Sequence, residues 1–194
     1  MPRDDIKKKR PRVTLHMVAS LDGIVAKKDN TVSWLDGYAD VYERGVTEES
    51  ARAQQALNPI DCFVLGSRTY EHALELGWPY GETPTIVLTS RRLPCTKSSV
   101  AFYAGDLPKL VHEALAPRYG NVWLCGGAML CQNFLKLDLV DEIRLMVAPI
   151  LLGDGLRLFG DLFTEQRWNL TNVTAYKNGF VELSYRLPAR ELSS

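Results

Sequence analysis

Small and hydroxyl-bearing residues follow three short apolar segments of the chain. The segments and their sequels are Cys62–Leu65 with Gly66-Ser67-Arg68-Thr69, Thr85–Leu88 with Thr89-Ser90-Arg91-Arg92, and Val122–Cys125 with Gly126-Gly127-Ala128. Glycines let an anion approach the backbone, hydroxyls form hydrogen bonds, and a guanidinium binds two phosphate oxygens at once. If the segments are parallel strands, these turns meet at their carboxyl ends, beside helix N-termini, where ligands of open α/β sheets bind. Each turn alone is typical of an ordinary loop or helix cap, but the threefold pattern predicts a site for a polyphosphorylated ligand.

Signatures of other nucleotide-binding, hydrolytic and zinc enzymes are absent from the sequence. There is no GxxxxGKS/T phosphate loop, no GxSxG nucleophile turn and no HxE…PCxxC zinc pattern. Gly153-Asp154-Gly155 begins like GxGxxG but lacks the third glycine, so we interpret it as a surface turn. The histidines at 16, 72 and 112 are far apart, which favours structural or surface roles over a metal site.

The segment Ser20–Ala26, with the sequence SLDGIVA, directly follows the first expected strand. Asp-Gly at a strand exit is typical of a tight turn. Alternatively, the segment is a mobile loop that covers a ligand held at the same sheet edge. Both interpretations remain open at this point.

Apolar patterns predict strands and helices in alternation. Strands are expected at Val13–Ala19, Cys62–Leu65, Thr85–Leu88, Val100–Tyr103, Val122–Cys125 and 143–148. Helices are expected at Arg68–Leu76, at Leu107–Leu115 before Pro117, around Leu130–Leu137, and in the polar stretch Tyr38–Leu57, broken near Gly45 and capped at Thr47. Asn178-Gly179 between two alternating runs predicts a C-terminal antiparallel hairpin. The sequence thus predicts one α/β domain over 12–188, with a flexible basic lead-in at 1–11 and a tail at 189–194.

Composition narrows the class of protein. The 194 residues are 46% hydrophobic, and 23 basic residues balance 23 acidic ones. Zero net charge argues against a general nucleic-acid binder, and no apolar run is long enough to span a bilayer. The polar N-terminus does not resemble a secretory signal. The four cysteines, Cys62, Cys95, Cys125 and Cys131, form no CxxC pair, which favours a reducing cytoplasm.

Five motifs in order resemble the dihydrofolate-reductase superfamily. They are SLDGIVA, LGSRTYE, WPYGETPTIVLTSR, CGGAMLCQNFLKLDLVDEI and APILLGDGLRLF, within about Arg12–Leu187. The resemblance is greatest to the reductase domain of bacterial riboflavin-biosynthesis deaminase–reductases. It implies a mostly parallel central sheet flanked by helices on both faces, an antiparallel C-terminal hairpin, hydride transfer from NADPH, and a homodimer.

The resemblance also implies roles for individual residues. Gly66, Ser67, Arg68 and Thr69 would contact the cofactor phosphates, Thr89, Ser90 and Arg91 would hold the adenosine ribose and its 2′-phosphate, and Gly126, Gly127 and Ala128 would face the pyrophosphate and the nicotinamide. Asp22 would border the nicotinamide and the substrate. In dihydrofolate reductases the acid that supports protonation lies on the first helix, for which the candidates are Asp36, Asp40 and Glu43, with Asp36 taken as the catalytic candidate beside Asp22.

Two positions depart from the riboflavin pattern. Ile24 stands where those reductases usually carry lysine, and Cys125 stands where they often carry an acid. Both positions serve the phosphorylated pyrimidine substrate in that family, so Cys125 is a candidate substrate contact. Trp34 either walls the substrate pocket or lies in the core.

The resemblance therefore implies an NADPH-dependent reductase of a small heterocycle. The first candidate reaction is that of 5-amino-6-(5-phosphoribosylamino)uracil reductase in riboflavin biosynthesis. The alternatives are a pterin or dihydrofolate reductase-type enzyme and a non-catalytic nucleotide-binding protein that keeps the fold.

Overall fold

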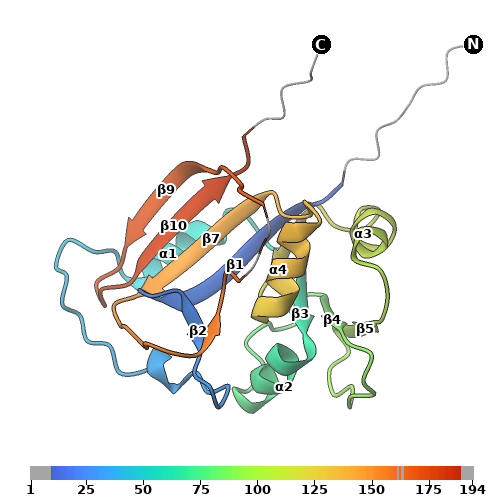
Figure 1. Cartoon of the computed structure of the whole chain (residues 1–194), viewed down its shortest axis with the longest axis horizontal. Helices are drawn as coiled ribbons and strands as arrows, with labels where there is room; N and C mark the ends of the chain where they lie inside the picture. Colours follow the sequence, from blue (N-terminus) through green and yellow to red (C-terminus); the bar gives the residue numbers. More distant parts are fainter. Residues whose placement is uncertain (1–9, 161, 163, 189–194) are drawn as a thin grey trace, which may run out of the picture.

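A central sheet organises the protein (Figure 1). The computed structural model describes residues 10–160, 162 and 164–188. The strands of the sheet are β1 Arg12–Ser20, β3 Cys62–Gly66, β4 Thr85–Leu88, β5 Val100–Tyr103, β6 Asn121–Leu124, β7 Glu142–Ala148, β9 Asn169–Ala175 and β10 Val181–Arg186. They run in the order β5-β4-β3-β6-β1-β7-β10-β9. Every pair from β5 to β7 is parallel, whereas β10 is antiparallel to β7 and to β9. The predicted α/β sheet and C-terminal hairpin are confirmed.

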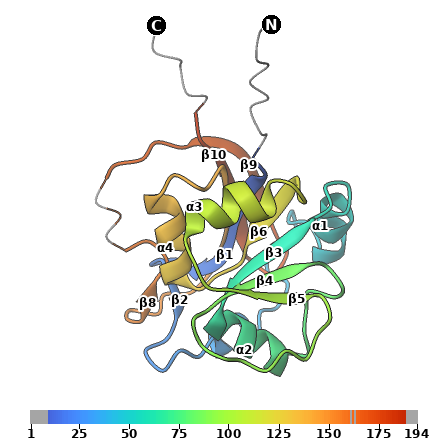
Figure 2. The ribbon, with the colours of Figure 1, turned by 90° about the vertical axis from the view of Figure 1, so that its right-hand side faces the viewer.

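Helices cover both faces of this sheet (Figure 2). They are α1 Glu48–Gln55, α2 Ser67–Glu75, α3 Leu107–Lys109, which continues as the π-helical turn Leu110–Leu115, and α4 Ala128–Lys136. The helices α1 and α2 connect strands that advance toward β5, while α3 and α4 connect strands that advance toward β7. Because parallel crossovers are right-handed, the two pairs of helices lie on opposite faces.

Successive residues of the buried strands pack into different cores, since side chains alternate between the two faces. In β3, Val64 belongs to the core beneath α3 and α4, which also contains Leu15 and Phe134. Leu65 belongs to the core beneath α2, with Tyr70. This explains why β3 is a continuous apolar run rather than an alternating one.

The segment before α1 differs from the prediction, because it is not helical between Tyr38 and Gly45. Its backbone instead pairs with the hairpin: the N–H groups of Val41 and Tyr42 donate to Lys177 O, both at 2.9 Å. The chain becomes helical only after Thr47, whose Oγ1 accepts from Ser50 N at 3.2 Å, as the cap prediction required. Tertiary hydrogen bonds thus override a polar, helix-prone sequence.

Two short strands that the sequence did not predict form a second, two-stranded sheet. They are β2 Ile24–Ala26 and β8 Leu156–Arg157, which pair antiparallel. They join the SLDGIVA segment to the chain after β7.

The two ends of the predicted domain differ from each other in the structure. Of the expected lead-in, residues 1–9 lie outside the described residues, whereas Arg10 forms an ion pair with Asp141 and Pro11 is buried. The expected tail, 189–194, also lies outside them. Within the described part of the chain, no helix has the length and apolar character needed to cross a membrane.

Candidate active site

The turns after β3 and β6 touch each other, as their positions in adjacent parallel strands require. Gly66 N donates to Gly126 O at 2.8 Å, and Cys125 N donates to Val64 O at 3.0 Å. A Cβ built on Gly126 would lie 3.3 Å from Thr69 Oγ1. Two of the three predicted turns therefore form one continuous surface at the carboxyl edge of the sheet.

Glycine is needed at this junction because the two backbones approach closely. A Cβ on Gly66 would lie 3.3 Å from Gly127 N. Gly126 has a φ of +111°, and a Cβ there would lie 3.1 Å from Met17 Sδ. The Gly126–Gly127 peptide bond is cis. Glycine at positions 66 and 126 therefore lets the two turns pack directly against each other.

Helices α2 and α4 both begin at this junction, and they begin differently from the other helices. Their N-cap residues, Gly66 and Gly127, supply no side-chain hydrogen bond to the first turn. By contrast, α1 is capped by Thr47 and α3 by Asp106, whose Oδ1 accepts from Lys109 N at 2.9 Å. Within the described residues, the first N–H groups of α2 and α4 are therefore left without side-chain caps. Two positive helix ends side by side suit a ligand with adjacent phosphates.

The third predicted turn flanks α2, because β4 is the other neighbour of β3. Thr89 Oγ1 accepts from Arg91 N at 3.0 Å, which orders the turn. The Arg91 guanidinium donates from Nη2 to Glu71 Oε2 on α2 at 2.7 Å. The order β4-β3-β6 thus places all three turns along one edge, in agreement with the sequence prediction.

The remaining predicted cofactor residues differ in exposure. Arg68 and Ser90 are exposed, whereas Ser67 and Thr69 are half-buried. Ala128 is 1% exposed within the core, so the atoms it offers a ligand are those of its backbone.

Glu71 was missed by the sequence analysis. Its position three residues after Arg68 in an expected helix was the available signal, because that spacing places both on one helix face.

Asp22 fastens two loops together beside this edge. Its Oδ1 accepts from Ser20 Oγ at 2.5 Å and from Leu152 N at 3.2 Å, and its Oδ2 accepts from Gly153 N at 2.7 Å. These hydrogen bonds, that of Ser20 first, lower the pKa of Asp22 to about 2 against an opposing contribution from burial. Asp22 is therefore ionised at neutral pH and suits the positioning of the SLDG segment better than proton donation.

Replacing Asp22 by alanine should release the backbone of residues 152–153. We expect the amides of Leu152 and Gly153 to exchange with solvent about tenfold faster or more, because hydrogen bonds to a charged acceptor are lost. The wild-type protection should hold above the ordinary pKa of 3.8 and disappear as the pH falls toward 2, since the folded-state pKa is the lower one.

Asp29 provides the matched control for this experiment, because its carboxylate accepts from Thr31 within its own turn. Asp29→Ala should leave the exchange of Leu152 and Gly153 unchanged. Unaltered exchange in Asp22→Ala would refute the fastening role. The measurement is hydrogen–deuterium exchange resolved at single amides.

The candidate substrate and proton-donor residues do not lie together, and they differ in burial. Trp34 is 5% exposed in a core with Ala148 and Phe180, and its indole Nε1 has no hydrogen-bond partner within the described part of the chain. Asp36 follows the short 3₁₀ turn Ser33–Leu35 and is exposed. Burial raises the pKa of the Cys125 thiol, so this residue is neutral. The prediction required Asp36 to lie on the first helix. It does not, because that helix begins only at Glu48.

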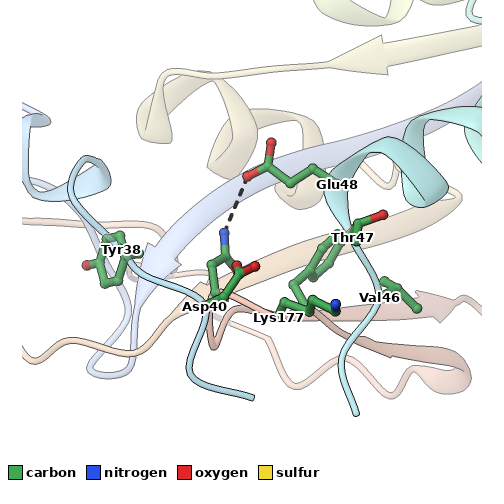
Figure 3. Close-up of a pocket in the computed structure, with 8 residues that line it drawn as sticks. Tyr38, Asp40, Val46, Thr47, Glu48 and Lys177 are labelled. Atoms are coloured by element: carbon green, nitrogen blue, oxygen red, sulfur yellow. Dashed lines mark hydrogen bonds between the residues drawn. The ribbon is translucent and has the colours of Figure 1, made fainter. Parts of the chain in front are cut away.

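A separate cavity of about 210 Å³ lies where the segment before α1 meets the hairpin (Figure 3). It is lined by Tyr38, Asp40, Val46, Thr47, Glu48, Tyr176, Lys177 and Asn178. Asn178 Nδ2 donates to Glu48 Oε1 at 3.3 Å across it. The hairpin is separated from β6 by β1 and β7, so this cavity is distinct from the three turns. Asp40, another candidate acid, lines this cavity rather than the predicted site.

Comparisons with known proteins agree with this architecture. The uncharacterized protein YwjB of Bacillus subtilis (strain 168) is 29% identical over 184 residues, which are 90% of this chain and 97% of YwjB. The riboflavin biosynthesis protein RibD of Corynebacterium ammoniagenes is 28% identical over 178 residues, which are 82% of this chain. Because the match covers 49% of that RibD, this chain corresponds to about half of its length.

Solved structures show the same fold. A crystal structure from Shewanella sp. PV-4, provisionally assigned to riboflavin biosynthesis, superposes with a TM-score of 0.76 at 26% identity, over 92% of this chain and 99% of that one. The deaminase/5-amino-6-(5-phosphoribosylamino)uracil reductase of Thermotoga maritima superposes with a TM-score of 0.65 at 16% identity, over 93% of this chain and 58% of that one. The dihydrofolate-reductase-like fold is thereby confirmed. Residues 11–181 match the model of the RibD C-terminal domain, and the chain belongs to this family of reductase-like proteins.

Proposed function

We propose that this protein is an NADPH-dependent reductase of a small heterocyclic substrate. The observation that carries the proposal is the pair of uncapped helix starts, α2 and α4, joined through Gly66 and Gly126 and flanked by Arg91. Adjacent backbone donors beside a guanidinium match the pyrophosphate and 2′-phosphate of NADPH. When bound, NADPH supplies a hydride.

The residues at the edge would divide the cofactor among them. The first N–H groups of α2, with the hydroxyls of Ser67 and Thr69, would bind one phosphate, and the backbone of Gly127 and Ala128 would bind the next. Thr89 and Ser90 would bind the adenosine ribose, and Arg91 would bind the 2′-phosphate. These groups position the cofactor, and positioning is the main contribution that a protein makes to direct hydride transfer.

The substrate would lie between the SLDG segment and the end of β6. RibD reductases suggest 5-amino-6-(5-phosphoribosylamino)uracil as the first candidate. The second candidate is a neutral pterin-like ring, which two observations favour: Ile24 is 1% exposed and carries no charge, and the Cys125 thiol is neutral. Neither residue offers an ionic contact to a phosphorylated substrate. Water would supply the proton, with Asp22 holding the loop in place.

The test is whether the purified chain consumes NADPH, which is monitored as a fall in the absorbance of NADPH. Phosphoribosylaminopyrimidine, pterin, dihydrofolate and cyclic imine substrates are supplied separately, each with NADPH and with NADH. We expect saturable turnover with one class and a preference for NADPH. Saturable NADPH binding without turnover of any class would favour the non-catalytic alternative. Absence of binding would contradict both.

A further inference from the structure

Glu71 is an acidic side chain placed among the cations of the proposed phosphate site. Its carboxylate lies 2.7 Å from Arg91 Nη2, and the two side chains are 42% and 51% exposed. Arg68 precedes Glu71 by three residues on α2, and Arg92 follows Arg91. Among the residues that the structure describes, the side chains of Arg68 and Arg92 form no ion pair or hydrogen bond. The start of α2 and the turn after β4 thus carry three arginines and the carboxylate of Glu71.

Two hydrogen bonds, one next to each residue, position the backbone around the contact between Glu71 and Arg91. Tyr70, the residue before Glu71, is fully buried and donates from its hydroxyl to Pro94 O at 2.7 Å. This bond fastens the chain after Arg91 to α2. On the other side, the Thr89 Oγ1 contact fixes the Arg91 backbone. These two hydrogen bonds therefore hold the backbones that carry Glu71 and Arg91 close to each other.

We propose that Glu71 sets cofactor selectivity by competing with the 2′-phosphate of NADPH for Arg91. In the absence of cofactor, Glu71 occupies one edge of the guanidinium. A phosphate dianion that binds the remaining N–H groups comes close to the Glu71 carboxylate, and like charges repel. NADH lacks the 2′-phosphate and does not meet this repulsion. Glu71 thus restrains the preference for NADPH that Arg91 confers. This inference rests on the proposed function.

Glu71→Gln tests the inference because glutamine keeps an oxygen that can accept from Arg91 but removes the charge. The probes are 2′,5′-ADP, which carries the 2′-phosphate without the nicotinamide, and 5′-AMP, measured by calorimetry. We expect 2′,5′-ADP to bind about three- to tenfold more tightly to the variant, the size expected for removing a nearby like charge at an exposed site. Binding of 5′-AMP should not change. The gain should shrink at high salt.

Glu75→Gln is the matched control, since Glu75 lies one turn further along α2 and contacts His72 rather than Arg91. It should leave both affinities unchanged. In an Arg91→Ala background, most of the gain from Glu71→Gln should disappear, because without the guanidinium nothing holds the 2′-phosphate beside Glu71.

The outcomes separate the inference from the function on which it rests. If the wild-type protein binds 2′,5′-ADP but Glu71→Gln binds it equally or more weakly, competition by Glu71 is wrong and the NADPH site stands. A gain that persists in full without Arg91 also overturns competition for that residue. If the wild-type protein binds neither NADPH nor 2′,5′-ADP, the proposed function fails and the inference fails with it.

Discussion

Replacing Glu182 by alanine should lower the free energy of unfolding by about 3–5 kcal/mol, because it leaves a half-buried guanidinium without its counter-ion. The Glu182 side chain is 3% exposed on β10. Its Oε1 accepts from Arg144 Nη2 at 2.6 Å and from Nε at 3.2 Å, and its Oε2 lies 3.7 Å from His16 Nε2. The Arg144 guanidinium is enclosed further by the Trp123 ring, 5.1 Å from its centroid.

The same cluster predicts how stability depends on pH. Burial raises the pKa of Glu182, but the nearby His16 ring and the hydrogen bonds and charge of Arg144 outweigh it and hold the pKa below its ordinary value of 4.5. The folded state therefore binds this proton less readily than the unfolded state. The stabilisation should be complete above about pH 4.5 and should be lost as the pH falls through the folded-state pKa.

Urea denaturation at neutral and acidic pH measures both effects. Glu165→Ala is the control, since Glu165 is 83% exposed and lies 3.5 Å from Arg167. It should change the free energy of unfolding by less than about 1 kcal/mol, as exposed ion pairs do. Equal losses in the two variants, or a loss in Glu182→Ala that does not diminish in acid, would contradict the account.

Replacing Arg91 by alanine should change cofactor choice more than any other substitution at the edge of the sheet. A guanidinium bound to a phosphate contributes charge-assisted hydrogen bonds, so its removal should raise the Kd of NADPH about ten- to a hundredfold. The Kd of NADH should rise by less than about threefold, because NADH lacks the 2′-phosphate. Fluorescence titration of each reduced cofactor measures the ratio.

Arg92→Ala is the matched control, an exposed arginine at the next position. Its effect on either cofactor should be small, since the structure fixes Arg91, not Arg92, against α2. If Arg91→Ala lost equal affinity for NADPH and NADH, Arg91 would not be the residue that binds the 2′-phosphate. A larger selectivity change in Arg92→Ala would transfer that role to Arg92.

The elements predicted with most success are those whose residues carry local signals. Cys62–Leu65 and Thr85–Leu88 are apolar on both faces, so they had to be central strands, and Asn178-Gly179 required a hairpin turn. Thr47 marked the start of α1 because its hydroxyl can cap the helix. In each case the cause lies within a few residues of the element.

The elements that the sequence could not predict depend on distant contacts. Residues 38–45 are polar and helix-prone, but the carbonyl of Lys177 pairs with their N–H groups. The alternation in β10 predicts a strand, yet it does not reveal that Glu182 faces a covered side of the sheet, because that depends on Arg144 and α1.

In the candidate site, too, the features with local sequence signals were predicted and those that depend on distant contacts were not. The turns after β3, β4 and β6 converge because their strands are neighbours, and the α/β pattern with its small residues was sufficient to predict this. The fastening of Asp22 to residues 152–153 and the pairing of Glu71 with Arg91 join segments 130 and 20 positions apart. No local pattern encodes such contacts.

The most direct test of the central claim is the structure of this chain crystallised with NADP⁺. We predict that the pyrophosphate lies against the first N–H groups of α2 and α4 at the Gly66–Gly126 junction, and that the 2′-phosphate contacts Arg91. A dinucleotide bound elsewhere, such as in the cavity of Figure 3, or no bound dinucleotide at saturating concentration, would contradict it.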